Sequence, residues 1–95
     1  MLTPKNKALL KKLANPLSPS LTVGKGEVDP QIVMVVDKAL SAHELIKVKV
    51  LVNQQEDLEK LGESLANSTK AELVSVIGRI LILYRPREKN PTIVL

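Results

Sequence analysis

The chain has 95 residues, a formal net charge of +4 and no cysteine. It is long enough for one domain with a modest core, and thiolate zinc sites, disulfides and cysteine nucleophiles are excluded. Tyr84 is the sole aromatic residue, which excludes folds that read unpaired bases by stacking them on several exposed rings. The positive excess lies in residues 1–52, where eight lysines face four carboxylates, whereas residues 53–95 are balanced.

The first predicted element is a helix over residues 4–14. Thr3 is a suitable N-cap, and Pro4 is favoured in a first helical turn because its missing N–H costs nothing there. The leucines recur at helical spacing on one side. The lysines occupy the remaining faces: Lys5, Lys7, Lys11 and Lys12. The pattern therefore predicts a helix that is apolar on one side and strongly basic on the others.

A short strand over 21–23 is predicted to stop at Gly24-Lys25-Gly26, and a helix over 30–42 follows the cap at Asp29. A lysine held between glycines beside a helix N-terminus is a candidate phosphate site. The alternative is that the glycines serve only the tight turn, and the nearby carboxylates of Glu27 and Asp29 weaken the attraction for an anion. The nucleotide-binding motifs built on glycine are absent.

Residues 45–52 alternate in the manner of a strand, with one face apolar and the other carrying Lys47 and Lys49. Helical spacing then predicts a helix over 56–68 with its carboxylates near the N-terminus, where the helix dipole favours them. Two strands over 72–77 and 80–84 are predicted to form a hairpin.

The hairpin is predicted to turn on Gly78-Arg79, which form a two-residue loop. Strand 80–84 is apolar on both faces, so we expect it inside the sheet. The element order is a leading helix followed by β-α-β-α-β-β. Two successive β-α-β units predict parallel pairing with right-handed crossovers, and the hairpin adds an antiparallel neighbour. We therefore predict an α+β, two-layer domain over 1–87, with a mixed four-stranded sheet, helices mainly on one face and a tail over 88–95.

Catalytic constellations are missing from this pattern. His43 is the single histidine and ends a predicted helix, with no nucleophile and orienting carboxylate beside it. The carboxylates over 56–63 are spread along a helix and indicate a solvated face. We expect no enzyme activity, no metal and no cofactor. No apolar run of about 18 residues and no charged secretion signal are present, so a cytoplasmic protein is expected.

Several short segments resemble one known family when they are taken together. They are Leu2-Thr3-x-Lys5, Leu13-Ala14, Val23-Gly24-Lys25-Gly26, His43-Glu44-Leu45-Ile46-Lys47-Val48-Lys49, Val76-Ile77-Gly78 and Tyr84-Arg85. The chain is similar, over about residues 2–87, to the CRM domain (chloroplast RNA splicing and ribosome maturation) in its single-domain bacterial YhbY form. The resemblance implies a fold related to the C-terminal domain of translation initiation factor three. It also implies RNA binding and association with precursors of the large ribosomal subunit.

Two positions depart from the family pattern. The family turn is usually Gly-x-x-Gly, which places a second glycine at the position of Glu27, and Asn15 stands where a histidine is common. The phosphate site is therefore assigned to Gly24, Lys25 and Gly26 without Glu27.

The sequence thus predicts a monomeric RNA-binding protein that acts on ribosomal RNA or a pre-ribosomal particle, without a membrane or small-molecule partner. Lys25 would contact phosphate, and Lys47 and Lys49 would line the exposed sheet face. Further basic residues would give electrostatic support: Lys5, Lys11, Lys12, Arg79, Arg85 and Arg87. Charge contacts to phosphates carry little sequence information, so low sequence discrimination is expected. The alternative is a protein-interaction adaptor that docks its basic face on an acidic partner.

Overall fold

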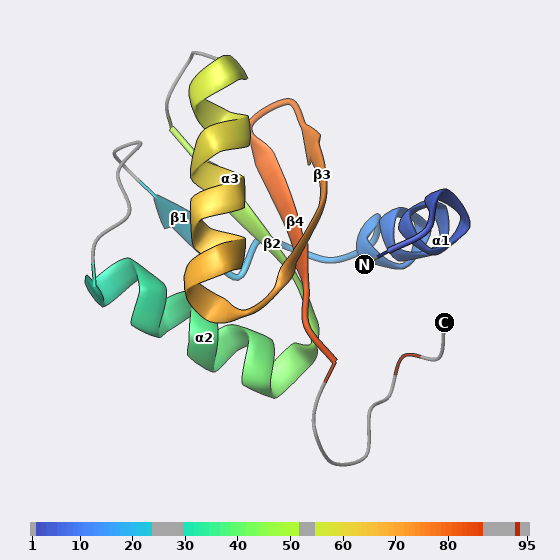
Figure 1. The fold of residues 1–95 in the computed structure, drawn as a ribbon, viewed down its shortest axis with the longest axis horizontal. Helices are drawn as coiled ribbons and strands as arrows, with labels where there is room; N and C mark the ends of the chain where they lie inside the picture. The colour runs from blue at the N-terminus through green and yellow to red at the C-terminus, as the bar shows by residue number, and fades with distance from the viewer. Residues whose placement is uncertain (1, 24–29, 52–54, 87–92, 94–95) are drawn as a thin grey trace.

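The computed structural model describes residues 2–23, 30–51, 55–86 and 93. The helices and strands follow one another in the predicted order (Figure 1): α1 (Pro4–Ala14), β1 (Leu21–Val23), α2 (Pro30–His43), β2 (Leu45–Val50), α3 (Gln55–Thr69), β3 (Glu72–Ile77) and β4 (Ile80–Tyr84). The strands form one mixed sheet in the order β1-β2-β4-β3, which confirms the predicted fold class. No helix in the described ranges is long and apolar enough to cross a membrane.

β4 lies inside the sheet, between β2 and β3, and runs antiparallel to both. This confirms the position predicted from its two apolar faces. The predicted parallel pairing is confirmed for β1 and β2 but is wrong for β2 and β3. The hairpin folds β4 back between those two strands, so β2 and β3 do not pair with each other.

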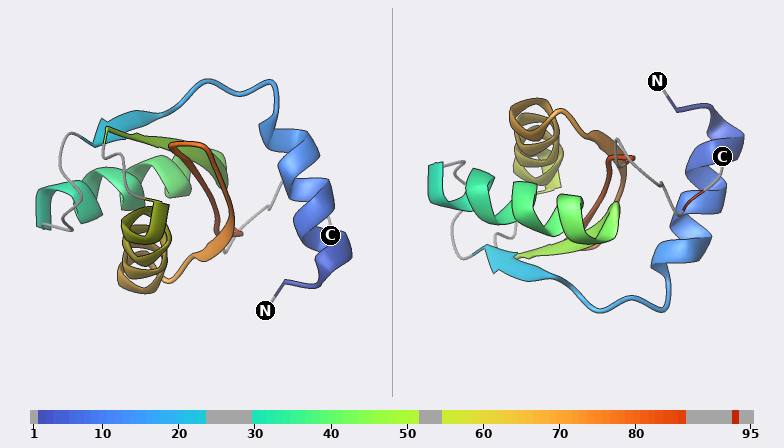
Figure 2. Two further views of the ribbon diagram at one scale, coloured as in Figure 1. Left: turned by 90° about the horizontal axis from the view of Figure 1, so that it is seen from above. Right: turned by 90° about the horizontal axis from the view of Figure 1, so that it is seen from below.

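Helices cover both faces of the sheet, with α2 and α3 on one side and α1 alone on the other (Figure 2). The larger core joins α2 and α3 to the sheet through residues such as Leu40 and Leu65. The smaller core joins Leu10 and Ala14 of α1 to side chains such as Ile82 on the opposite face. The helices are thus mainly on one face, as predicted, and the basic helix α1 is alone on its side.

The β3–β4 hairpin turns on Gly78 and Arg79 as predicted. Gly78 has a φ of +58°, the left-handed conformation that two-residue hairpin loops require. The register of β3 shifts between Leu73 and Ser75. This bulge places Leu73 and Val76 on the same side of the sheet, against the larger core, although residues three apart on a regular strand face opposite sides.

Helices α2 and α3 each end at a non-glycine residue in the left-handed conformation. Glu44 follows α2 with a φ of 62°, and its N–H donates to the carbonyl of Leu40 at 2.9 Å. Lys70 follows α3 with a φ of 57°, and the N–H of Ala71 donates to the carbonyl of Ala66 at 2.8 Å, which closes a Schellman motif. Both helices run one residue beyond their predicted ends, because no glycine marks either stop in the sequence.

Candidate nucleic-acid interface

The outer surface of α1 is basic because of how the helix is anchored. Thr3 caps it as predicted, since its Oγ1 accepts a hydrogen bond from the N–H of Asn6 at 3.1 Å. Leu10 and Ala14 are buried against the sheet. At 100° per residue, Lys5 and Lys12 then point away from the sheet, and both are exposed.

The other two lysines of α1 lie on one flank of the helix. Lys11 lines a small hollow of about 110 Å³ beside Lys47 and the β3–β4 hairpin. Lys7 lines a larger groove along β3. Lys7 was not among the predicted site residues, although its spacing from Lys11 already placed both on one side of the helix. α1 therefore offers four exposed lysines and no acidic residue.

The sheet face beneath α1 is only partly covered. The register aligns Thr22, Lys49, Ile80 and Ile77 in one row across the four strands. Lys49 and Ile77 in this row are exposed, whereas Ile82 and Tyr84 farther along β4 are buried under α1. Lys49 therefore has the position on the open sheet face that the sequence predicted.

Lys47 shares that face but is held within the protein. Its Nζ donates to the carbonyl oxygens of Asn15 and Leu17, each at 3.1 Å. The side chain is half-buried. Lys47 thus fastens the end of α1 to β2, and its ammonium is less available to a phosphate than that of Lys49.

Three chain segments meet at the end of the sheet next to Lys49. The N–H of Val50 donates to the carbonyl of Arg79 at 2.8 Å, and the N–H of Leu51 donates to the carbonyl of Val23 at 3.0 Å. The ends of β1 and β2 therefore lie beside the hairpin turn, where Arg79 is exposed. The predicted phosphate site at 24–26 follows Val23 in the sequence, but Gly24, Lys25, Gly26 and Arg87 lie outside the described residues.

Arg85 follows β4 at the end opposite the hairpin turn, and its side chain connects β4 to α2 and α3. One guanidinium nitrogen contacts Asp37 Oδ1 at 2.5 Å and the carbonyl of Thr69 at 2.7 Å. The other donates to the carbonyl of Asp37 at 3.0 Å and to Ser41 Oγ at 2.9 Å. Contact between Arg85 and RNA stays a prediction that this geometry does not support, because the guanidinium already donates hydrogen bonds to residues of α2 and α3.

Tyr84 cannot serve as a stacking platform for bases, because the residue is buried and only 4% exposed. Burial raises the pKa of its hydroxyl, and the nearby charge of Glu44 raises that pKa further. Glu44 itself is fully buried. The phenol ring of Tyr84 therefore belongs to the smaller core and is not available for stacking on an unpaired base.

His43 ends α2 with an exposed side chain, which lines a shallow hollow with Leu13, Leu45 and Ile93.

Within the described ranges, no three histidine or acidic side chains lie close enough together to hold a metal ion. The geometry therefore offers ammonium and guanidinium groups spread over a surface, an arrangement suited to contacts with several phosphates.

Comparisons with known proteins agree with one another. A family model described as the CRS1 / YhbY (CRM) domain matches residues 2–85. A Bacillus subtilis protein named "Probable RNA-binding protein YqeI" is 40% identical over 95 residues, which cover 100% of this chain and 99% of the relative. A Haemophilus influenzae protein named "RNA-binding protein" is 39% identical over 88 residues, which cover 93% and 89%.

The fold has a counterpart among solved structures. The solution structure of the SAV1595 protein from Staphylococcus aureus, whose description suggests RNA binding, matches with a TM-score of 0.89. The two chains are 40% identical, and the match covers 100% of this chain and 99% of the other.

Proposed function

The chain belongs to the CRS1/YhbY (CRM) domain family, and from this membership we propose that it is a non-catalytic protein that binds RNA by its phosphates. The observation that carries the proposal is α1, which has four exposed lysines and no acidic residue and lies alone on its side of the sheet. Lys49 and Arg79 extend the positive charge onto the sheet and the hairpin turn. A one-sided basic field of this kind attracts polyanions.

We define the basic surface by its described members: Lys5, Lys7, Lys11, Lys12, Lys49 and Arg79. Lys25 is the proposed further phosphate contact, since it follows β1 at the end of the sheet that carries Lys49 and Arg79. Such contacts fix the position of the nucleic acid and carry little sequence information. The burial of Tyr84 supports the same conclusion, so discrimination between sequences should be low.

The proposed target is ribosomal RNA in precursors of the large ribosomal subunit, bound in the cytoplasm by a monomer during assembly. This finer proposal is supported by the family resemblance of the sequence, which implies that association. Co-sedimentation of the protein with large-subunit precursors, lost after nuclease treatment, tests it. Co-sedimentation that survives nuclease would favour the protein-adaptor alternative instead.

RNA binding itself is tested by titrating a structured ribosomal RNA fragment with the full chain at several salt concentrations. Lys5→Gln with Lys12→Gln should weaken binding and lower the dependence of log K on log salt by about 1 for each phosphate that the protein no longer neutralises. Lys60→Gln with Lys70→Gln is the matched control, because it removes the same charge from exposed positions outside the basic surface. Equal reductions in affinity for the two double variants would contradict the proposed surface.

A further inference from the structure

We propose that the outer edge of β3 is a docking site for an extended basic segment of a partner protein, which would add a strand to the sheet. The site faces the gap between α1 and α3, and Lys7 is the member of the basic surface that also lines it. The inference does not depend on RNA binding, because it rests on backbone geometry and on carboxylates.

The sheet order leaves one edge at β1 and one at β3. β1 has three residues and β3 has six, so only β3 offers a length suited to pairing with another chain. Among the described residues, β3 pairs with β4 alone. The turn closes on the Ile77–Ile80 pair, and the antiparallel ladder alternates from there, so the backbone N–H and C=O of Val76 point away from β4.

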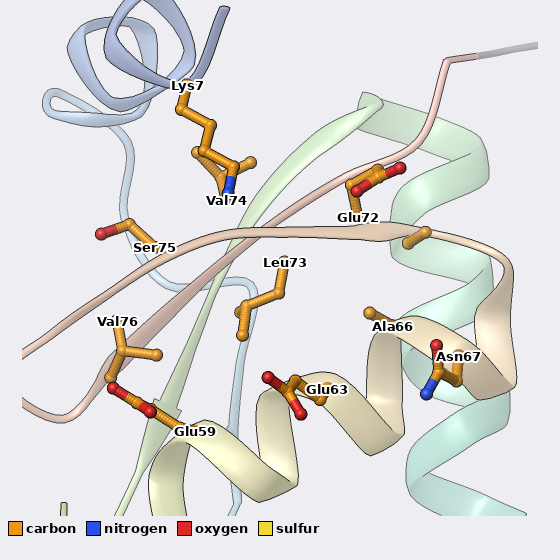
Figure 3. A pocket seen from close by; sticks show the side chains of 11 residues that line it. Lys7, Glu59, Glu63, Ala66, Asn67, Glu72, Leu73, Val74, Ser75 and Val76 are labelled. Atoms are coloured by element: carbon orange, nitrogen blue, oxygen red, sulfur yellow. The ribbon is translucent and has the colours of Figure 1, made fainter. Parts of the chain in front are cut away.

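A groove of about 590 Å³ runs along this edge. Figure 3 shows β3 crossing it, with Lys7 of α1 on one side of the strand and Glu59 and Glu63 of α3 on the other. Strand addition in such a groove uses main-chain hydrogen bonds for affinity and alternate side chains for specificity. The two faces of an added strand would therefore contact different residues, Lys7 on one side and Glu59 and Glu63 on the other.

Glu59 and Glu63 of α3 line one side of the groove, the α3 wall, and their charge determines which kind of partner can bind there. Glu59 and Glu63 are exposed and four residues apart, which places them about 6 Å apart along the helix. Alternate side chains of a strand are spaced about 6.8 Å apart. Because α3 runs beside β3 (Figure 1), lysines or arginines at alternate positions of an added strand can meet the two carboxylates in turn.

Other occupants fit this groove poorly. Phosphates of RNA would be repelled by Glu59 and Glu63. A second copy of the chain, paired antiparallel through β3, would bring its own α3 to the same side of the joined sheet and set like charges against each other. A basic peptide in extended conformation is the occupant that both the strand edge and the α3 wall favour.

The test uses the full chain, without RNA, and a synthetic peptide of alternating lysine and valine, Lys-Val-Lys-Val-Lys-Val-Lys. Binding is followed by the backbone amide signals in NMR titrations. The signal of Val76 should shift, and its N–H should exchange more slowly with solvent. The controls are a scrambled peptide of the same composition and a peptide in which glutamate replaces lysine, and neither should shift Val76.

Two variants separate the backbone and charge contributions. Val76→Pro removes the outward N–H from an edge position where proline is tolerated, and Val76→Ala keeps that N–H while shortening the side chain. The proline variant should weaken peptide binding by about 2- to 12-fold relative to the alanine variant, since it loses a main-chain hydrogen bond. If Val76→Pro does not fold, Glu59→Gln with Glu63→Gln provides the second measurement, and it should weaken binding by a similar factor.

The proposal is overturned if the scrambled peptide binds as tightly as the alternating one, or if the shifts avoid β3. It is also overturned if the glutamine variant binds unchanged. None of these outcomes bears on the proposed RNA function, because the Lys5 and Lys12 variants test that separately.

Discussion

The ammonium of Lys47, on β2, donates a hydrogen bond of 3.1 Å to the carbonyl oxygen of Asn15, the residue that ends α1. The same ammonium also donates to the carbonyl of Leu17. Carbonyl oxygens at a helix C-terminus have no partner within the helix and carry partial negative charge, so a lysine is well matched to them. The contact connects the C-terminal end of α1 to β2.

Lys47→Met should therefore act mainly on stability. It removes hydrogen bonds from a charged donor, and we expect the free energy of unfolding to fall by about 1–2 kcal/mol in urea denaturation. Lys49→Met, on the same strand and face, is the control and should change stability by less than about 0.5 kcal/mol. RNA affinity should show the reverse order, with the larger reduction for Lys49→Met. A larger reduction of affinity for Lys47→Met in the folded state would contradict this division of roles.

Arg85→Met should destabilise the protein by about 2–3 kcal/mol, since one guanidinium loses its bonds to α2 and to the end of α3. The ion pair with Asp37 is partly exposed, so Asp37→Asn should cost less, about 0.5–1 kcal/mol, and the cost should shrink with salt. Arg79→Met on the exposed hairpin turn is the matched control for the arginine change. Equal unfolding midpoints for the Arg85 and Arg79 variants would show that the connection is not stabilising.

Tyr84 should make stability pH-dependent in the alkaline range. Its pKa in the folded protein is raised above the ordinary value of 10.0, so the folded state holds the proton more tightly than the unfolded state. This contribution is complete below pH 10 and is lost as pH rises through the folded pKa. The sole tyrosine can be titrated by its absorbance without overlap, and the midpoint should lie above 10.0. Tyr84→Phe should remove the corresponding slope of stability, and a midpoint at or below the ordinary value would refute the expectation.

Gly62→Ala should destabilise the protein although alanine favours helices. A Cβ on Gly62 would lie 2.9 Å and 3.0 Å from the two terminal carbons of Leu73. The gain in helix propensity is about 1 kcal/mol, whereas overpacking a core typically costs about 1–3 kcal/mol. We expect a net loss of about 1 kcal/mol by calorimetry or denaturation. Adding Leu73→Ala should remove the steric part, so the double variant should be more stable than the sum of the single changes predicts. Strict additivity would argue against the clash.

The fold was largely predictable because its local signals agree. Thr3-Pro4, Gly78-Arg79 and the alternation of 45–50 each mark an element that the structure confirms. The apolar faces of residues 80–84 predicted an interior strand but not that it separates β2 from β3, since a hairpin can add its second strand on either side of the first. The helix ends at His43 and Thr69 were also missed by one residue, because the left-handed residues that follow them, Glu44 and Lys70, are not glycines.

The candidate site was predictable only as a set of charges. Exposure of Lys5, Lys12 and Lys49 follows from periodicity, and the structure agrees with it. The internal roles of Lys47 and Arg85 could not be read from the sequence, because their partners lie 30 or more residues away along the chain in most of these contacts. A long cationic side chain looks the same in sequence whether it meets solvent or a carbonyl oxygen.

The position of β4 has a consequence for how the protein is made. A ribosome releases the chain from its N-terminus, so residues 80–84 emerge after β1, β2 and β3. Yet β4 lies between β2 and β3 in the sheet. Among the described strands, β3 pairs with β4 alone. A nascent chain that has not yet released β4 can hold β1 beside β2 but cannot join β3 to that pair. Closure of the sheet therefore waits for β4, and the chain up to Tyr84 must be outside the ribosome before the four strands can be joined.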